Sequence, residues 1–488
     1  MGSEPHQLHT FFFPLMAQGH LLPAIDMARL FASRGVKVTI ITTPLNAPLF
    51  SKTIDRDNQL GLDISVQLIP FPSEEAGLPQ GCENISSITN FSEMAPRFFN
   101  ALDLFQNPLQ ELLQNHSPDC LVADMFFPWA TDIAAKFGIP RLIFHGTSFF
   151  SLCVLDSLKR YTPHENIKSE TENFIVPGLP DQIELMRSQL PNHLKTPSDL
   201  GKLLERVRES EGNCYGVLVN SFYELEPAYA DHYRKVIGRK AWNIGPVSLS
   251  NRDIAYKAQR GNIASIDEHA CLSWLDSKKP NSVLYVSFGS VARFTDSQML
   301  EIAMGLEDSG YPFIWVVRSK EEDEQRWMPE GFEERIKGKG LIIRDWAPQV
   351  LILDHPAVGG FVTHCGWNST LESVSAGVPM ITWPLFAEQF YNEKLVTQVL
   401  RIGVCVGAHE WSKFGGGGGG EKAAAVKRED IEKAVEQLMG GGEEAERMRN
   451  RAMELKEMAR SAVEGGGSSY TDLTALIEEL GLHPQPAV

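Results

Sequence analysis

Two separate parts of the chain alternate short apolar runs with amphipathic stretches, and this alternation constrains the fold more than any other feature. In the first part, His9–Pro14 predicts a strand, Leu21–Arg34 predicts a helix that ends before Gly35, and Val36–Thr42 predicts a second strand. Strands connected through a helix run parallel, because the helix returns the chain to the end at which the first strand began. Further strands of this series are expected at Asp63–Ile69, Cys120–Ala123, Arg141–Phe144 and Gly216–Asn220.

A second series begins with a predicted strand at Ser282–Ser287 and a helix from about Ser297 to Ser309. Its further strands are expected at Phe313–Val317, Gly340–Arg344, Gly360–Thr363 and Pro379–Trp383. A chain of 488 residues is too long for one hydrophobic core. We therefore predict two Rossmann-like α/β domains, 1–245 and 267–488, joined by a polar linker at 246–266, and the last helix can pack back on the first domain. Ligands of such sheets bind at the carboxyl ends of the strands.

Composition excludes several classes of protein. Hydrophobic residues make up 43% and charged residues 22% of the chain, as in ordinary globular proteins. The net charge of −17 argues against a nucleic-acid partner, because phosphate backbones attract basic surfaces. The seven scattered cysteines form no C-x-x-C pair, which favours reduced thiols in the cytoplasm. No apolar run of ~20 residues predicts a transmembrane helix, and we expect a monomer.

The segment Trp346–Gln389 carries the strongest functional signal. Within it, Gly360–Thr363 predicts a buried strand, Cys365–Asn368 a turn, and Ser369–Ala376 a helix, with Ser369 and Glu372 spaced as a capping box. The free N–H groups and positive dipole at the start of such a helix suit a diphosphate. Cys365 can be read either as a nucleophile or as a small residue packed under the turn.

From W-A-P-Q through H-C-G-W-N-S-T-L-E to P-L-F-A-E-Q, this segment resembles the signature box of the plant UDP-dependent glycosyltransferases of small molecules. The resemblance implies a GT-B fold, in which two Rossmann-like domains with parallel sheets face a central cleft and the second domain binds a UDP-sugar. It implies that Trp346 stacks on uracil, that Gln349 lies near the ribose and that Glu372 accepts from the ribose hydroxyls. The donor-binding residues carried over from the family are Gly289, Ser290, Trp346, Ala347, Gln349, His364, Trp367, Asn368, Ser369, Glu372, Glu388 and Gln389.

Several of these residues also have a purely structural interpretation. Gly289 and Ser290 can form an ordinary turn after a strand, Glu372 can cap its helix, and Trp367 can be a core residue. Glu388 stands where many relatives have Asp. Gln389 is the residue that the family usually has with glucose donors, so the resemblance implies UDP-glucose as co-substrate and leaves other donor sugars open. The resemblance implies no further cofactor and no metal.

Two residues of the first domain are candidates for catalysis. His20 follows the first predicted strand, and Asp124 follows the strand at Cys120–Ala123, so both lie at carboxyl ends. Position alone leaves open whether they cap or pack helices, or whether His20 takes a proton from an acceptor hydroxyl while Asp124 holds its ring. The segment M-A-Q-G-H and the isolated Asp resemble the family's catalytic dyad, which assigns the second role to both.

The resemblance implies inverting transfer of a sugar from its α-linked donor to a hydroxyl, giving a β-glycoside. The segments F-H-G-T-S-F-F-S-L and F-A-E-Q-F-Y-N-E-K-L are similar to the branch that acts on flavonoids and on triterpenoid or steroid aglycones. Candidate walls for such a lipophilic acceptor, each of which can equally be core, are Phe126, Phe127, Phe149 and Phe150.

Two other functions, sugar-nucleotide binding without transfer and epimerisation, fit the sequence less well. A UDP-sugar-binding protein without transfer activity would have lost its base, whereas His20 is present. A UDP-sugar epimerase would need G-x-G-x-x-G after the first strand, where this chain has M-A-Q-G-H. The run Gly415–Gly420 predicts a surface loop, because neither a preceding strand nor a following G-K-S/T makes it a phosphate cradle.

Overall fold

The computed structural model describes residues 6–251, 253–258, 260–262, 264–318, 324, 326–411 and 425–483. The run Gly415–Gly420 lies outside these ranges. In the described part of the chain, no helix is both long and apolar enough to cross a membrane.

The first half of the chain forms a parallel sheet. Within the described residues its strand order is β3-β2-β1-β4-β5-β8-β9, and every neighbouring pair runs parallel. The strands are β1 (His9–Phe13), β2 (Lys37–Thr42), β3 (Ile64–Leu68), β4 (Cys120–Asp124), β5 (Arg141–Phe144), β8 (Gly216–Val219) and β9 (Ala241–Asn243). The strand order reverses between β1 and β4, so the carboxyl ends of these two neighbours leave a crevice there.

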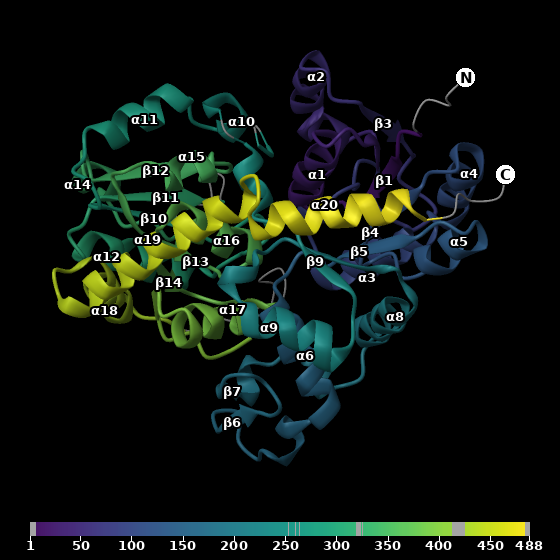
Figure 1. Ribbon diagram of the computed structural model, residues 1–488. Helices are drawn as coiled ribbons and strands as arrows, with labels where there is room; N and C mark the ends of the chain where they lie inside the picture. Colours follow the sequence, from purple (N-terminus) through teal and green to yellow (C-terminus); the bar gives the residue numbers. More distant parts are fainter. Residues whose placement is uncertain are drawn as a thin grey trace.

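The second half forms a second parallel sheet, with the order β12-β11-β10-β13-β14-β15 in the part of the chain that the structure describes. Its strands are β10 (Val283–Ser287), β11 (Phe313–Val317), β12 (Gly340–Arg344), β13 (Val358–Thr363), β14 (Met380–Thr382) and β15 (Gly403–Cys405). Here the order reverses between β10 and β13. A separate antiparallel pair, β6 (Asn173–Val176) and β7 (Ile183–Met186), projects from the first half (Figure 1).

Helices surround both sheets (Figure 1). Those of the first half are α1 (Gln18–Ala32), α2 (Ser51–Gln59), α3 (Phe91–Asp103), α4 (Gln106–His116), α5 (Ala130–Lys136), α6 (Phe149–Tyr161), α7 (Asn192–Lys195), α8 (Asp199–Asn213) and α9 (Pro227–His232). Those that follow are α10 (Ile254–Ala258), α11 (Glu268–Asp276), α12 (Asp296–Asp308), α14 (Phe332–Arg335), α15 (Gln349–Leu353), α16 (Trp367–Ala376), α17 (Gln389–Lys394), α18 (Arg428–Met439), α19 (Glu443–Val463) and α20 (Ser468–Gly481).

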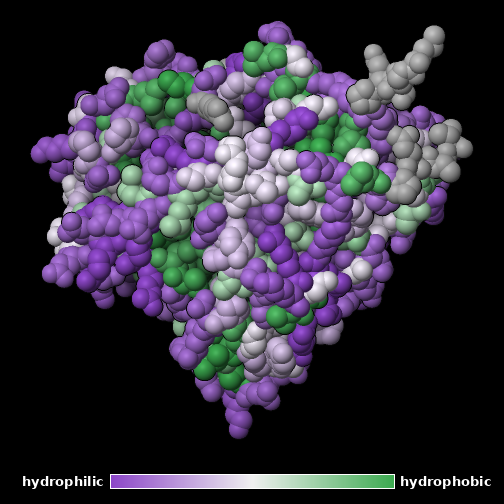
Figure 2. All heavy atoms as spheres, viewed as in Figure 1, coloured by the Kyte–Doolittle hydropathy of each residue, from purple (hydrophilic) through white to green (hydrophobic). Residues whose placement is uncertain are grey.

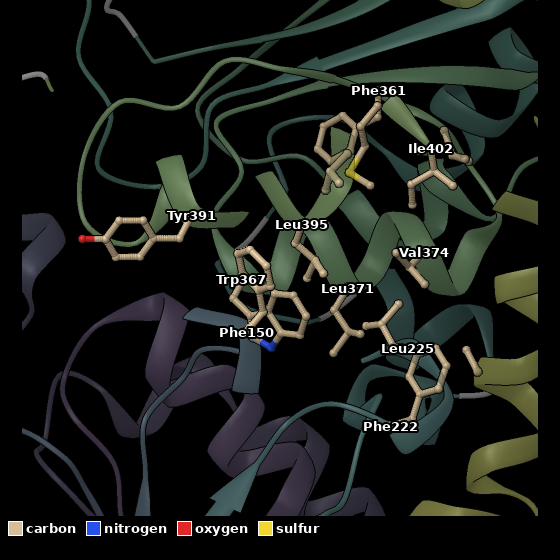
Figure 3. Packing of buried hydrophobic residues seen from close by; sticks show 14 of the residues in the cluster. Phe150, Phe222, Leu225, Phe361, Trp367, Leu371, Val374, Tyr391, Leu395 and Ile402 are labelled. Atoms are coloured by element: carbon tan, nitrogen blue, oxygen red, sulfur yellow. The ribbon is translucent and has the colours of Figure 1, made fainter. Parts of the chain in front are cut away.

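The two halves share buried surface. One apolar cluster contains Phe150 and Phe222 from the first half and Trp367 and Leu371 from the second (Figure 3). Such a shared core holds the two sheets in one arrangement, because separating them would expose its apolar area to water. Over the face seen in Figure 2, hydrophilic residues predominate and apolar residues are confined to separate patches.

The C-terminal helix α20 lies across the first sheet, although it follows the second in sequence (Figure 1). Its Leu473 and Leu476 join an apolar cluster with Phe12 and Trp242. Asp472 accepts a hydrogen bond from Arg234 Nη2 at 2.9 Å, which fixes the register of the helix on this surface.

The sequence prediction missed two kinds of element and placed the start of one helix too late. Strands β9 and β15 are only three residues long, and the β6–β7 pair interrupts the strand–helix alternation. The helix α1 begins at Gln18 rather than at Leu21, so His20 lies in its first turn and not in the preceding loop.

Candidate active site

The carboxyl ends of both sheets open onto one cavity of about 510 Å³, a volume suited to small-molecule ligands. His20 lies beyond β1, and Gly289 and Ser290 follow β10. These three residues line the cavity together with all the other predicted donor residues. The two strand-order reversals therefore face each other across the same space.

His20 and Asp124 form a pair at the first reversal. His20 Nδ1 lies 2.7 Å from Asp124 Oδ2, and Asp124 Oδ1 accepts from the backbone N–H of Phe126 at 3.0 Å. Because β1 and β4 are neighbours in the sheet, residues 104 positions apart meet at its edge. With Nδ1–H donating to the carboxylate, the lone pair of His20 Nε2 is free to accept a proton.

The charge around His20 favours its protonated form. Burial lowers the pKa of His20, but the charge and hydrogen bond of Asp124 and the charge of Glu388 raise it more, so the pKa lies above its ordinary value. Burial also raises the pKa of Glu388, against the N–H groups and His20 that lower it. His20, on the first domain, and Glu388, from the signature segment, therefore share one electrostatic environment.

His364 is held between two glycines at the second reversal. A Cβ on Gly289 would lie 2.6 Å from His364 Cε1, and a Cβ on Gly366 would lie 2.4 Å from Nε2, so only glycine fits either position. Burial lowers the pKa of His364 to about 4, which keeps the imidazole neutral at physiological pH. Its Nδ1 is buried without a partner among the described residues, so a ligand can complete its hydrogen bonding.

The capping-box prediction is wrong. The helix α16 begins at Trp367, its N-cap is Gly366, and no side chain caps it. Ser369 therefore lies inside the first turn, where its hydroxyl accepts from Gln349 Nε2 at 3.1 Å. An uncapped helix start leaves backbone N–H groups for an anionic ligand.

Glu372 is engaged by two side chains rather than by its own helix. Its Oε1 accepts from Arg260 Nη1 at 2.6 Å, and its Oε2 accepts from Gln349 Nε2 at 2.7 Å. Gln349 thus links Glu372 to Ser369, and these residues lie together on the cavity wall as the resemblance implies.

Trp367 and Asn368 make contacts that the sequence did not suggest. Trp367 is buried in the apolar cluster (Figure 3). Its indole Nε1 donates to the carbonyl oxygen of Asn220 at 2.7 Å, which links the two halves, and the residue also lines the cavity. Asn368 Nδ2 donates to the carbonyl oxygen of Gly19 at 2.7 Å, which connects the signature segment to the residue before His20.

Trp346 lines the cavity together with two cationic residues that sequence reasoning missed, Arg318 and Arg260. The guanidinium of Arg318 lies 5.9 Å from the centre of the Trp346 ring, and burial together with Arg293 lowers its pKa to about 10. Arg318 follows β11 directly, so its place at a carboxyl end could have identified it. Arg260 belongs to the linker, where no pattern marked it. Ala347 also lines the cavity, and the Trp346 indole nitrogen is buried without a partner among the described residues.

Gln389 and Glu388 both line the cavity. Gln389 Oε1 accepts from the backbone N–H groups of Leu385 and Phe386, at 2.9 and 3.0 Å. The oxygen is thereby fixed and the amide NH₂ group remains for a ligand.

Cys365 is buried and its pKa is raised well above the ordinary value by burial, so it packs as a neutral thiol rather than acting as a nucleophile.

Of the four candidate acceptor walls, only Phe126 lines the cavity, with its ring 5.8 Å from that of His20. Phe127 is fully buried and stacks on Phe13 at 4.1 Å. Phe149 and Phe150 are fully buried against Tyr233 and Tyr229. For these three, packing against neighbouring aromatic rings decided the orientation, and the prediction is wrong. The apolar walls that sequence reasoning missed include Phe91, Phe99, Leu152, Leu155, Leu200 and Leu204.

Comparison with known proteins identifies the family. The family model described as UDP-glucoronosyl and UDP-glucosyl transferase matches residues 82–412. The chain belongs to this UDP-glycosyltransferase family. This UDP-glycosyltransferase is 57% identical over 479 residues to a scopoletin glucosyltransferase of Nicotiana tabacum, with 98% of each chain covered. It is 58% identical over 476 residues to UDP-glucose flavonoid 3-O-glucosyltransferase 7 of Fragaria ananassa, with 97% of this chain and 96% of that chain covered.

Solved structures of plant relatives confirm the GT-B fold. UGT73P12 of Glycyrrhiza uralensis, crystallised with glycyrrhetinic acid 3-O-monoglucuronide, is 46% identical and superposes with a TM-score of 0.90 over 97% of this chain and 96% of that chain. UGT71G1 of Medicago truncatula, crystallised with UDP-glucose, is 26% identical, with a TM-score of 0.79 over 97% and 98% of the two chains. The UDP-glycosyltransferase described here is thus an enzyme of the family that the signature segment indicated.

Proposed function

We propose that this enzyme transfers glucose from UDP-glucose to a hydroxyl group of a lipophilic plant metabolite, a flavonoid or a triterpenoid or steroid aglycone, with inversion to a β-glucoside. The first domain, 1–245, binds the acceptor, and the second, 267–488, binds the donor. The observation that carries the proposal is the His20–Asp124 pair, 2.7 Å apart, on the same cavity as the signature segment.

His20 is the general base in this proposal. Its Nε2 takes the proton of the acceptor hydroxyl while the hydroxyl oxygen forms a bond to the anomeric carbon of glucose. The bond from that carbon to the diphosphate oxygen breaks, and its electron pair leaves with UDP. Attack from the side opposite the leaving group inverts the configuration. Asp124 orients the ring through Nδ1 and stabilises the imidazolium that forms.

The leaving diphosphate is stabilised by the second domain. The free N–H groups and positive end of α16 face the cavity, and the neutral His364 can donate one hydrogen bond. Ser290, Asn368 and Ser369 lie on the same wall. These groups are in place before the reaction, so stabilising the new charge costs no reorganisation.

The donor's other parts have their own contacts. Trp346 stacks on uracil, beside Ala347, and Glu372 with Gln349 binds the ribose hydroxyls. Glu388 and Gln389 contact the sugar, a carboxylate accepting from one hydroxyl and an amide donating to the next. The backbone of Trp367 and the turn at Gly289 let the diphosphate approach.

The acceptor class follows from the cavity and the relatives. Phe126 and its apolar neighbours suit a flat or polycyclic skeleton, and the names of the relatives include a coumarin and a flavonoid as acceptors. Incubation of the purified enzyme with UDP-glucose and a panel of phenols and triterpenoids, analysed by mass spectrometry, tests the proposal. A mass increase of one hexose supports it, whereas UDP-glucose binding without any product would favour the non-transferring alternative.

A further inference from the structure

The segment Arg260–Asn262 of the predicted linker contacts both halves of the enzyme, and its Arg260 lines the cavity. On the first half it reaches Gln18 and Asp26 of α1, and on the second it reaches Trp346 and Glu372. These partners are close to the base or belong to the donor site, so the segment is more than a spacer between two sheets.

Arg260 bridges two buried carboxylates. Its Nε donates to Asp26 Oδ2 at 2.9 Å, and its Nη1 donates to Glu372 Oε1 at 2.6 Å. The side chains of Arg260, Asp26 and Glu372 are 11%, 5% and 5% exposed, so water screens their charges little. Asp26 is also bonded to Asn251 and lies 3.4 Å from Arg29, which holds this end of the bridge in place.

The residues on either side of this bridge fit the site closely. Gly261 has a φ of +95°, and a Cβ there would lie 2.4 Å from Trp346 Cζ2, so its backbone packs directly on the indole. Asn262 Oδ1 accepts from Gln18 Nε2 at 2.9 Å, two residues before His20. The linker therefore contacts Trp346 and Glu372, which are proposed to bind uracil and ribose, and Gln18, which lies two residues before the proposed base His20.

We propose that Arg260 is a positioning residue for donor binding, which acts through Glu372 on recognition of the nucleotide ribose. This inference rests on the proposed ribose contact of Glu372. With Arg260 and Gln349 each occupying one lone pair, the two remaining lone pairs of the carboxylate have fixed directions. The lone pairs that these two bonds leave on the carboxylate oxygens can accept from the ribose hydroxyls. Without Arg260, Glu372 could rotate and would carry an unpaired buried charge.

The test compares UDP-glucose with 2′-deoxy-UDP-glucose, which lacks one ribose hydroxyl. The preference is the ratio of kcat/KM for the two donors. We expect Arg260→Lys and Arg260→Gln to lower this preference about tenfold, the effect of ~1.4 kcal/mol. Glu372→Gln should lower it similarly, and the double variant Arg260→Gln/Glu372→Gln should lower it no further, because both residues act on one contact.

Lys257→Ala is the matched control. Lys257 joins the same linker to Asp354 of the second half rather than to Glu372, so its loss should leave the preference unchanged. Unfolding temperatures of all variants separate loss of fold from loss of recognition. If Arg260 only held the domains together, its variants would lower the melting temperature and affect both donors equally, and an unchanged preference would overturn the inference.

The outcome with Glu372→Gln distinguishes the two proposals. If Glu372→Gln lowers the preference for UDP-glucose and the Arg260 variants do not, the role of Arg260 is refuted. The ribose contact of Glu372 is supported in that case. An unchanged preference in Glu372→Gln refutes the ribose contact itself, and the inference about Arg260 falls with it.

Discussion

Asn368 Nδ2 donates a hydrogen bond to the carbonyl oxygen of Gly19, at 2.7 Å, across 349 positions of sequence. Gly19 immediately precedes His20, and Asn368 lies in the first turn of α16. The signature segment Trp346–Gln389 is therefore hydrogen-bonded directly to the backbone next to His20, the proposed base. The proposed contact of Asn368 with the diphosphate and the position of His20 therefore depend on the same side chain.

Asn368→Ala should lower kcat/KM for UDP-glucose by about tenfold, since it removes both the hydrogen bond to Gly19 and the proposed contact with the diphosphate, and each such bond contributes ~1 kcal/mol. Because Asn368 is proposed to act on both the donor and the base, both kcat and KM should change. Steady-state kinetics with calorimetric titration of UDP measures the two effects. An effect on KM alone would show that the bond to Gly19 does not position His20.

His20→Ala should lower kcat by ~10²–10⁴, the usual contribution of a general base. UDP affinity should remain nearly unchanged, because His20 is proposed to act on the acceptor. The measurement needs an alcohol acceptor, since an acidic phenol ionises without a base. Near-normal turnover of an alcohol by this variant at neutral pH would rule out the proposed role.

The pH dependence of kcat/KM should reflect the raised pKa of His20. The base acts in its neutral form, so activity should fall as pH decreases through a pKa above the ordinary 6.5. Asp124→Asn removes the charge that raises this pKa, and should move the acid limb to lower pH while lowering the maximal rate. Glu388→Gln should move it in the same direction. An acid limb that does not move in Asp124→Asn would contradict the assignment.

Gln389→Glu tests the choice of donor sugar with little change in shape. The new side chain keeps an oxygen for the N–H groups of Leu385 and Phe386 but loses the amide donor. We expect the unmodified enzyme to prefer UDP-glucose over UDP-galactose and UDP-xylose, and the variant to lose this preference more than its UDP affinity. Competition assays with the three donors measure it, and equal rates in the unmodified enzyme would refute the claim.

Phe126→Ala and Phe127→Ala form a matched pair. Phe126 lines the cavity, so its loss should raise the acceptor KM with a small effect on stability. Phe127 is fully buried on Phe13, so its loss should cost about 3–5 kcal/mol of folding free energy. Acceptor kinetics and thermal unfolding give the two readouts. The reverse pattern would mean that the acceptor lies elsewhere in the cavity.

Local sequence patterns predicted the parallel strands and the family correctly. Strands β1, β4, β10 and β13 were found because they are almost entirely buried and each contains a run of apolar residues. The ends of these strands located His20, Asp124 and Gly289, since parallel strands end at one edge of a sheet. The short strands β9 and β15 were missed, whereas β14, equally short, was found inside the longer apolar run Pro379–Trp383.

Side-chain direction was decided by the tertiary structure. The sequence offered four phenylalanines as equal candidates for the acceptor wall, yet of these only Phe126 lines the cavity. The rings of the other three, Phe127, Phe149 and Phe150, pack against aromatic neighbours. The spacing of Ser369 and Glu372 fitted a helix cap, but Arg260 and Gln349 attract the carboxylate away from the helix start.

The sequence by itself thus determined most of the parallel strands, their order along the chain and most of the chemical groups of the site. Only the tertiary structure decided which groups meet, as with Arg260 and Glu372 or Asn368 and Gly19. The physical reason is sequence separation. Strand and helix patterns arise from neighbouring residues, whereas each of these contacts joins residues at least 112 positions apart and forms only when distant parts of the chain pack together.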